Sequence, residues 1–109
     1  MKSQSRTLAQ MSFAEFQQSV AADSTPPVGV SRAVQALWHD ARGDWERAHA
    51  CAQEEKGRDG SWVHAYLHRK EGDEGNAGYW YARARRPVPA SGVTLEAEWM
   101  DIARELLGG

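Results

Sequence analysis

The stretch AVQALWHDARGDWERAHACAQ, residues 33–53, is followed at an offset of 29 by WVHAYLHRKEGDEGNAGYWYA, residues 62–82, which repeats its pattern. Six aligned pairs are identical, whereas average composition gives roughly one or two by chance. Each copy predicts a helix, a Gly-Asp turn and a second helix, because glycine adopts the left-handed conformation that ends a helix and aspartate caps the next one. We therefore expect two helical hairpins. The identical pairs are Val34/Val63, Ala36/Ala65, His39/His68, Gly43/Gly72, Asp44/Asp73 and Ala48/Ala77.

Two further helices are predicted outside the hairpins. Ser12 and Glu15 have the spacing of a capping box, in which each side chain satisfies a free backbone amide of a first helical turn. This motif predicts a helix over residues 13–22. Thr94 is suited to cap a last helix over about residues 95–107, whose apolar side chains recur at three- and four-residue intervals.

These elements predict one all-α domain of about six helices. The domain is expected to span residues 12–109, preceded by a flexible arm over residues 1–11, which lack apolar periodicity. The hairpins are expected at about residues 31–55 and 61–86. A polar loop with two glycines, residues 56–60, separates them. No stretch of the sequence predicts a β-strand.

Composition excludes several classes of protein. Hydrophobic residues make up 41% of the chain and charged residues 26%, which is typical of a folded globular protein. The net charge of −2 does not favour nucleic-acid binding, and the acidic last helix is expected to lie against the more basic second hairpin. The single cysteine, Cys51, rules out an intrachain disulfide and is expected to be buried. With no signal peptide and no apolar run of membrane-spanning length, we expect a cytoplasmic protein.

The repeated turn resembles a known family. In residues 43–48 and 72–77 an alanine follows the glycine of the turn by five positions, as in the segment between the helices of tetratricopeptide-like repeats. Residues 79–84, YWYARA, are similar to the second helix of Sel1-type repeats, and the whole chain is also similar to small bacterial helical proteins. The period of 29 departs from the 34 of that family, and two copies are fewer than the three usually needed. The helices over residues 13–22 and 95–107 are therefore expected to cap the two open ends. The resemblance implies a scaffold without catalysis that binds a protein or a peptide.

The first candidate site is a histidine pair on the helix that opens the second hairpin. At 100° per residue, His64, His68 and Glu71 fall on one polar side of that helix, opposite an apolar stripe. Two histidines four residues apart can reach one metal ion, zinc or iron, from a helix. His39 occupies the position of His68 in the first hairpin and is expected to approach the same site. This pattern indicates a small metal-binding or hydrolytic protein as the alternative to a scaffold.

The second candidate is a partner-binding surface. Arg69 continues the polar side of the same helix, and Tyr79 and Arg83 share a face of the next one, where they are suited to contact an anion or an acidic peptide. The carboxylates Glu96 and Glu98 are expected on a solvated face. Without a phosphate-binding loop or a nucleophile motif, a binding role is favoured over an enzyme. The sequence favours the protein-interaction scaffold and leaves the small metal-binding or hydrolytic protein as the alternative. The residues expected to face a partner are His39, His64, His68, Arg69, Glu71, Tyr79 and Arg83.

Overall fold

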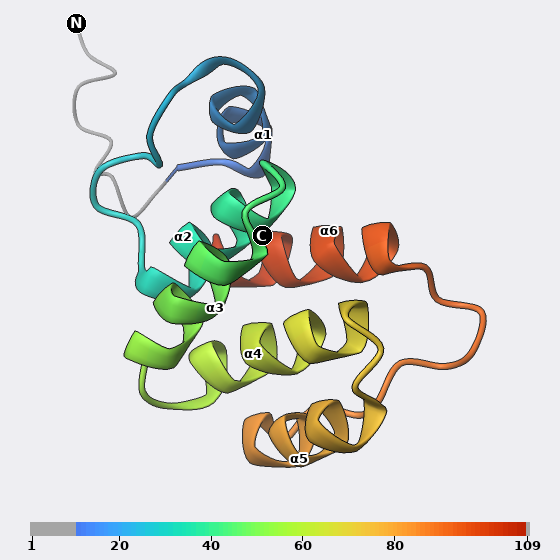
Figure 1. Cartoon of the computed structure of the whole chain (residues 1–109). Coiled ribbons are helices and arrows are strands. Elements are labelled where there is room, and N and C mark those ends of the chain that lie inside the picture. The colour runs from blue at the N-terminus through green and yellow to red at the C-terminus, as the bar shows by residue number, and fades with distance from the viewer. Residues whose placement is uncertain (1–10, 109) are drawn as a thin grey trace, which may run out of the picture.

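The computed structural model describes residues 11–108, so the predicted arm lies, apart from Met11, outside the described residues. Six α-helices and no strand occur in this range, which confirms the all-α prediction. None of the helices described combines the length and the apolar character needed to cross a lipid bilayer. The helices are α1 (Phe13–Ala22), α2 (Arg32–Ala41), α3 (Trp45–Glu54), α4 (Arg58–Lys70), α5 (Glu74–Ala84) and α6 (Leu95–Leu106) (Figure 1).

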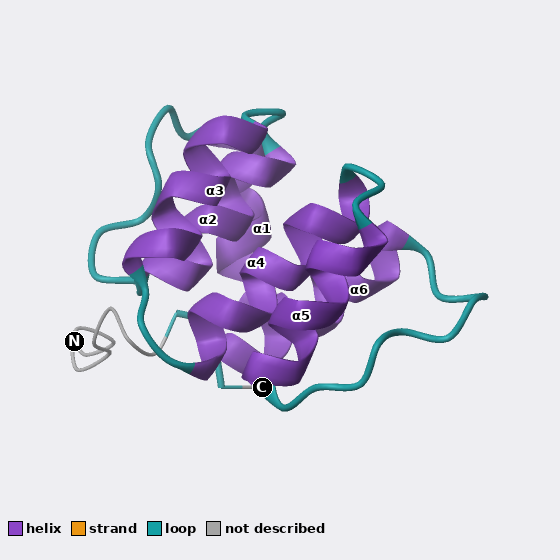
Figure 2. Cartoon of the chain, turned by 60° about the horizontal axis from the view of Figure 1, so that its bottom comes forward, coloured by secondary structure: helices purple, strands orange, loops and turns teal. Residues whose placement is uncertain are grey.

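Helix α4 is the centre of the molecule. It packs against α2, α3, α5 and α6, and Figure 1 shows it lying between α5 and α6. The nine residues 60–68 are all buried, so this helix has no solvent-facing side along most of its length. Helices α2 and α3 form the first hairpin beside it, as the view in Figure 2 also shows.

The two Gly-Asp turns close the hairpins as the sequence predicts. Gly43 and Gly72 have φ angles of +82° and +88°, in the left-handed region that favours glycine. The side chain of Asp44 accepts a hydrogen bond from the backbone N–H of Arg47, and Asp73 accepts one from Asn76. Each turn therefore ends one helix and caps the next within two residues.

Replacing Gly72 with alanine should lower the free energy of unfolding by about 1 kcal/mol, because a Cβ atom is strained at this φ angle. Gly78 offers a matched control, since it lies inside α5 and an added Cβ would meet no atom within 4 Å. Gly78→Ala should raise stability by about 0.5–1 kcal/mol, because alanine is the better helix former. Urea denaturation of the two variants measures both changes. Effects of the same sign would contradict this description of the turn.

The loop predicted at residues 56–60 is shorter than expected, because α4 begins at Arg58 rather than near Ser61. Gly57, with a φ angle of +100°, is the N-cap, which a sequence pattern does not distinguish from a loop glycine. Gly60 lies in the first turn of the helix. A Cβ atom there would stand 2.0 Å from the backbone oxygen of Glu55, so Gly60 is required by close packing rather than by a turn.

The two flanking helices meet each other instead of covering opposite ends of the hairpin pair. The ring of Phe16 in α1 stacks on Trp99 in α6, with centroids 5.8 Å apart. The indole N–H of Trp99 donates to the backbone oxygen of Leu37 at 3.0 Å, which fixes α6 against α2. Helix α6 thus lies across the first helices of both hairpins, α2 and α4. The face that these two helices present is covered by the chain itself.

A buried carboxylate joins α6 to the second hairpin. Glu98 is 5% exposed, so the prediction of a solvated face is wrong at this position. It accepts hydrogen bonds from Arg69 at 2.7 Å and from the hydroxyl of Tyr81 at 2.5 Å. A second ion pair, Arg86 with Glu105, lies nearer the surface. The acidic last helix therefore lies against the basic second hairpin, as the charge distribution predicts.

Candidate metal centre

Three histidine rings meet where α3 packs against α4. The ring centroids of His49 and His64 are 4.6 Å apart, those of His49 and His68 5.2 Å, and those of His64 and His68 4.8 Å. One nitrogen from each ring lies within 4.8 Å of the other two. Two indoles flank the group: Trp45 stacks on His49 and Trp80 stacks on His64. We call His49, His64 and His68 the histidine centre.

One atom of the histidine centre is a buried nitrogen without a partner. Nε2 of His49 is shielded from solvent and has no hydrogen bond in the part of the chain described. A buried polar atom left unpaired typically costs about 1–3 kcal/mol, and native proteins rarely keep one without a reason. A metal ion is one such reason, because it accepts the nitrogen lone pair directly.

A carboxylate orients the third ring. Nδ1 of His68 lies 3.1 Å from Oε2 of Glu71. In the tautomer of neutral His68 that carries its proton on Nδ1, this nitrogen donates to the carboxylate and the Nε2 lone pair is free. Metal-bound histidines very often have such a carboxylate partner, which fixes the tautomer and the orientation of the ring. Glu71 therefore suits a supporting role behind His68.

The surroundings keep two of the rings neutral. Burial, together with the neighbouring His49 and His68, lowers the pKa of His64 to about 4. Burial and the nearby His68 also lower the pKa of His49, against a smaller opposing effect of Glu71. Only a neutral imidazole has a lone pair for a metal ion. Near pH 7 both side chains are consequently in the form that binds metal.

The structure corrects the predicted position of the histidine pair. His64 and His68 are 4% and 7% exposed, so the expectation that they lie on a polar, solvent-facing side of their helix is wrong. The helical spacing does place them on the side opposite the apolar stripe. That side is buried because α3 packs on it, an arrangement that the pattern of one helix does not reveal.

His39 does not join the histidine centre, although it matches His68 in the repeat. Its ring is half-buried and lies edge-on to Trp38. His68 is covered by α3, the second helix of the preceding hairpin, whereas His39 belongs to the first hairpin and has no hairpin before it. The fourth histidine, His49, takes the place expected for His39. Its signal in the sequence is the four-residue spacing from Trp45, which puts both rings on the inner face of α3.

The predicted partner surface is divided among several parts of the molecule. Arg69 is held by the buried Glu98 and by the backbone oxygen of Val93, so it joins α4 to α6. Tyr79 and Arg83 are exposed on α5, where the guanidinium lies 5.8 Å from the centre of the tyrosine ring. Partner binding by these two side chains stays a prediction.

The chain matches no protein-family model, no curated protein and no solved structure. The interpretation of the site therefore comes from its geometry. His68 also belongs to a second possible ligand group with Glu71 and Asp73, both of which are exposed. Exposed carboxylates commonly gather without a metal ion, so the buried histidine centre is the stronger candidate.

Proposed function

We propose that this protein is a small metal-binding domain in which His49, His64 and His68 hold one zinc ion. The observation that carries the proposal is the buried, unpartnered Nε2 of His49 beside two further imidazoles. Zinc suits the site because it favours nitrogen ligands and takes three histidines in a tetrahedral arrangement with one open position. Iron, the other metal that the sequence suggests, more often takes a carboxylate beside two histidines.

The required rearrangement is small. Zinc–nitrogen bonds of about 2.0–2.1 Å place tetrahedral ligands about 3.4 Å from one another. The three nitrogens already lie within 4.8 Å, so ring rotations that move them by about 1 Å complete the geometry. The rings come from α3 and α4, and the indole N–H of Trp45 fixes these helices together by donating to the backbone oxygen of Leu67 at 3.0 Å.

The test is the zinc content of untagged protein after incubation with zinc and exhaustive dialysis. We expect about one zinc per chain in the natural protein and a loss of more than tenfold in His49→Gln, because a three-ligand site does not retain metal with two. His39→Gln is the matched control, since it removes a histidine of the same chain outside the centre, and it should retain the full zinc content.

Two outcomes would contradict the proposal. The first is natural protein without zinc under these conditions. The second is equal zinc content in the His49 and His39 variants, which would place the metal elsewhere. The double variant His64→Gln/His68→Gln provides an independent check, because it removes the two ligands of α4 and should also lose the metal.

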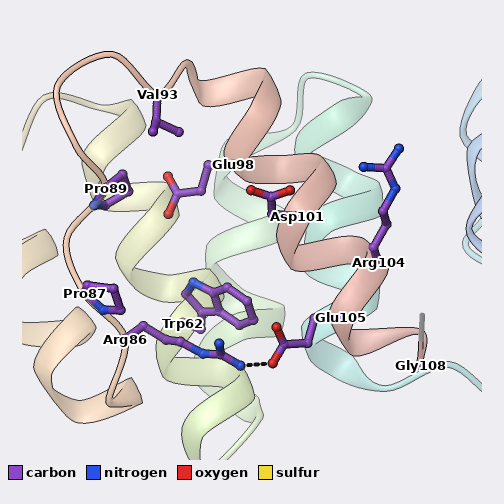
Figure 3. Close-up of a pocket in the computed structure, with 10 residues that line it drawn as sticks. All are labelled: Trp62, Arg86, Pro87, Pro89, Val93, Glu98, Asp101, Arg104, Glu105 and Gly108. Atoms are coloured by element: carbon purple, nitrogen blue, oxygen red, sulfur yellow. Dashed lines mark hydrogen bonds and ion pairs between the residues drawn. The ribbon is translucent and has the colours of Figure 1, made fainter.

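A protein-interaction role is the second candidate, and a groove on the other side of α4 favours it. The groove has a volume of about 750 Å³ and is lined by Trp62, two prolines and charged side chains of α6. Figure 3 shows Arg86 reaching across it toward Glu105, with the guanidinium 3.9 Å from the centre of the Trp62 ring. This role ranks second because charges of both signs line the groove and α6 covers the face of α2 and α4.

A further inference from the structure

A pocket of about 310 Å³ opens beside the histidine centre, where the loop after α3 meets the start of α4 and the end of α5. His64 and Trp80 form part of its wall. Its volume lies at the lower end of the range for small-molecule sites, so it suits a ligand of a few heavy atoms. Its lining is completed by Ala52, Gln53, Glu55, Lys56, Gly57, Gly60, Ser61 and Arg83.

The pocket contains the N-terminal end of the longest helix. Gly57, the N-cap of α4, has no side chain, and no side chain between residues 11 and 108 caps this helix end. Among the described residues, the first backbone N–H of α4 with a hydrogen-bond partner is that of Ser61, which donates to the oxygen of the N-cap Gly57. The preceding amides, of residues 58–60, have no hydrogen bond in the part of the chain described. Free amides and the helix dipole together make such an end a binding site for anions.

Two buried side chains in the same wall have unused hydrogen-bonding atoms. Ser61 is 7% exposed and His64 is 4% exposed, and both line the pocket. Neither side chain makes a hydrogen bond within the described residues. Their polar atoms are not sealed from solvent, since among the described residues only Nε2 of His49 is both sealed and unpartnered, so both side chains are open to a ligand in the pocket. They are evidence independent of the helix end.

The charges around the pocket favour an anion. Within the described residues neither Lys56 nor Arg83 makes an ion pair. The guanidinium of Arg83 lies over the rings of Tyr79 and Trp80 and donates a hydrogen bond to the hydroxyl of Tyr79. Lys56 and Arg83 are both exposed and able to turn toward the pocket. Glu55 contributes the one carboxylate of the lining, and it already accepts a hydrogen bond from the backbone N–H of Ala33. The lining thus contains two cationic side chains without an ion pair and one carboxylate that already accepts a hydrogen bond.

We propose that this pocket binds a phosphate-type oxyanion, either free phosphate or the phosphate group of a small ester. The amides at the start of α4 and the hydroxyl of Ser61 would donate to its oxygens, while Lys56 and Arg83 would balance its charge. The site does not depend on zinc. Since His64 belongs to both sites, the oxyanion would lie next to the metal when both are bound.

The test is a titration of metal-free, desalted protein with inorganic phosphate and, separately, with glycerol 2-phosphate, followed by amide NMR. The amides of residues 58–61 should shift in a saturable manner. If glycerol 2-phosphate binds more tightly, the ligand is an organic phosphate. If inorganic phosphate binds more tightly, the ligand is the free ion. Lys56→Gln/Arg83→Gln should weaken binding at least tenfold. Arg85→Gln, which removes an exposed arginine outside the lining, should leave it unchanged.

Shifts that never saturate, or equal weakening by the Arg85 and Lys56/Arg83 substitutions, would overturn the oxyanion site. Ser61→Ala gives a second measure, because it removes one donor without altering charge and should weaken binding severalfold. Binding that appears only after zinc is added would also overturn the proposal, because the anion would then be a metal ligand. Conversely, the protein could bind phosphate and take up no zinc. That result would support the oxyanion site and would contradict only the zinc centre.

Discussion

Zinc should raise the free energy of unfolding of this protein by about 4 kcal/mol when free metal stands about a thousandfold above its Kd. The reason is that the ligands come from α3 and α4 and meet only in the folded chain. An ion that binds only the folded state stabilises it by mass action. Urea denaturation with zinc and with a chelator measures the difference.

The histidine variants provide the controls for this measurement. His39→Gln should respond to zinc as fully as the natural protein, because its ring is outside the centre. His49→Gln should lose most of the response. If the denaturation midpoint of the natural protein is the same with zinc and with chelator, the three rings are an aromatic packing cluster and not a metal centre.

Replacing Arg69 with alanine should lower the free energy of unfolding by about 3–5 kcal/mol, because it leaves the carboxylate of Glu98 buried without its cation. Domains of this kind are stable by only about 5–15 kcal/mol, so the variant should be partly unfolded under mild denaturing conditions. Among the residues that the structure describes, only the hydroxyl of Tyr81 would still donate to the carboxylate. The free energy of unfolding is measured by urea denaturation.

The ion pair between Arg32 and Glu54 is the matched control, since both side chains are about half exposed. Arg32→Ala should lower the free energy of unfolding by less than about 1 kcal/mol, because solvent already screens the attraction between two exposed charges. Glu98→Gln combined with Arg69→Ala should recover part of the loss by removing the unpaired charge. Equal costs for the two arginine variants would contradict a structural role for the buried pair.

The helices were predictable because their ends have local causes. The capping box of Ser12 and Glu15 is formed, with each backbone N–H donating to the other side chain at 3.0 Å, and α1 spans the predicted residues. Asp44, Asp73 and Thr94 cap α3, α5 and α6. The exception is the start of α4. There Gly57 is the N-cap and Gly60 allows close packing, but the sequence alone does not distinguish these two roles from those of loop glycines.

The histidine centre was only half predictable. The spacing of His64 and His68 follows from helical geometry alone, so a shared site for this pair is evident from the sequence. The third ring depends on which helix packs on them, and the repeat pattern indicated His39 because equivalent positions were expected to lie side by side. Packing places α3 there instead, with His49 and Trp45 on its inner face. The burial of Glu98 is likewise set by contacts with residues 29 and 17 positions away.

The proton–nitrogen NMR spectrum of the imidazole rings, recorded on ¹⁵N-labelled protein during a zinc titration, tests the metal centre most directly. Each of the four histidines reports separately, and a nitrogen that binds metal changes its chemical shift. We expect one nitrogen each of His49, His64 and His68 to shift until one zinc per chain is added, while both nitrogens of His39 stay unchanged. Unchanged nitrogens in the histidine centre, or a shift of His39 equal to theirs, would contradict a zinc site at these three residues.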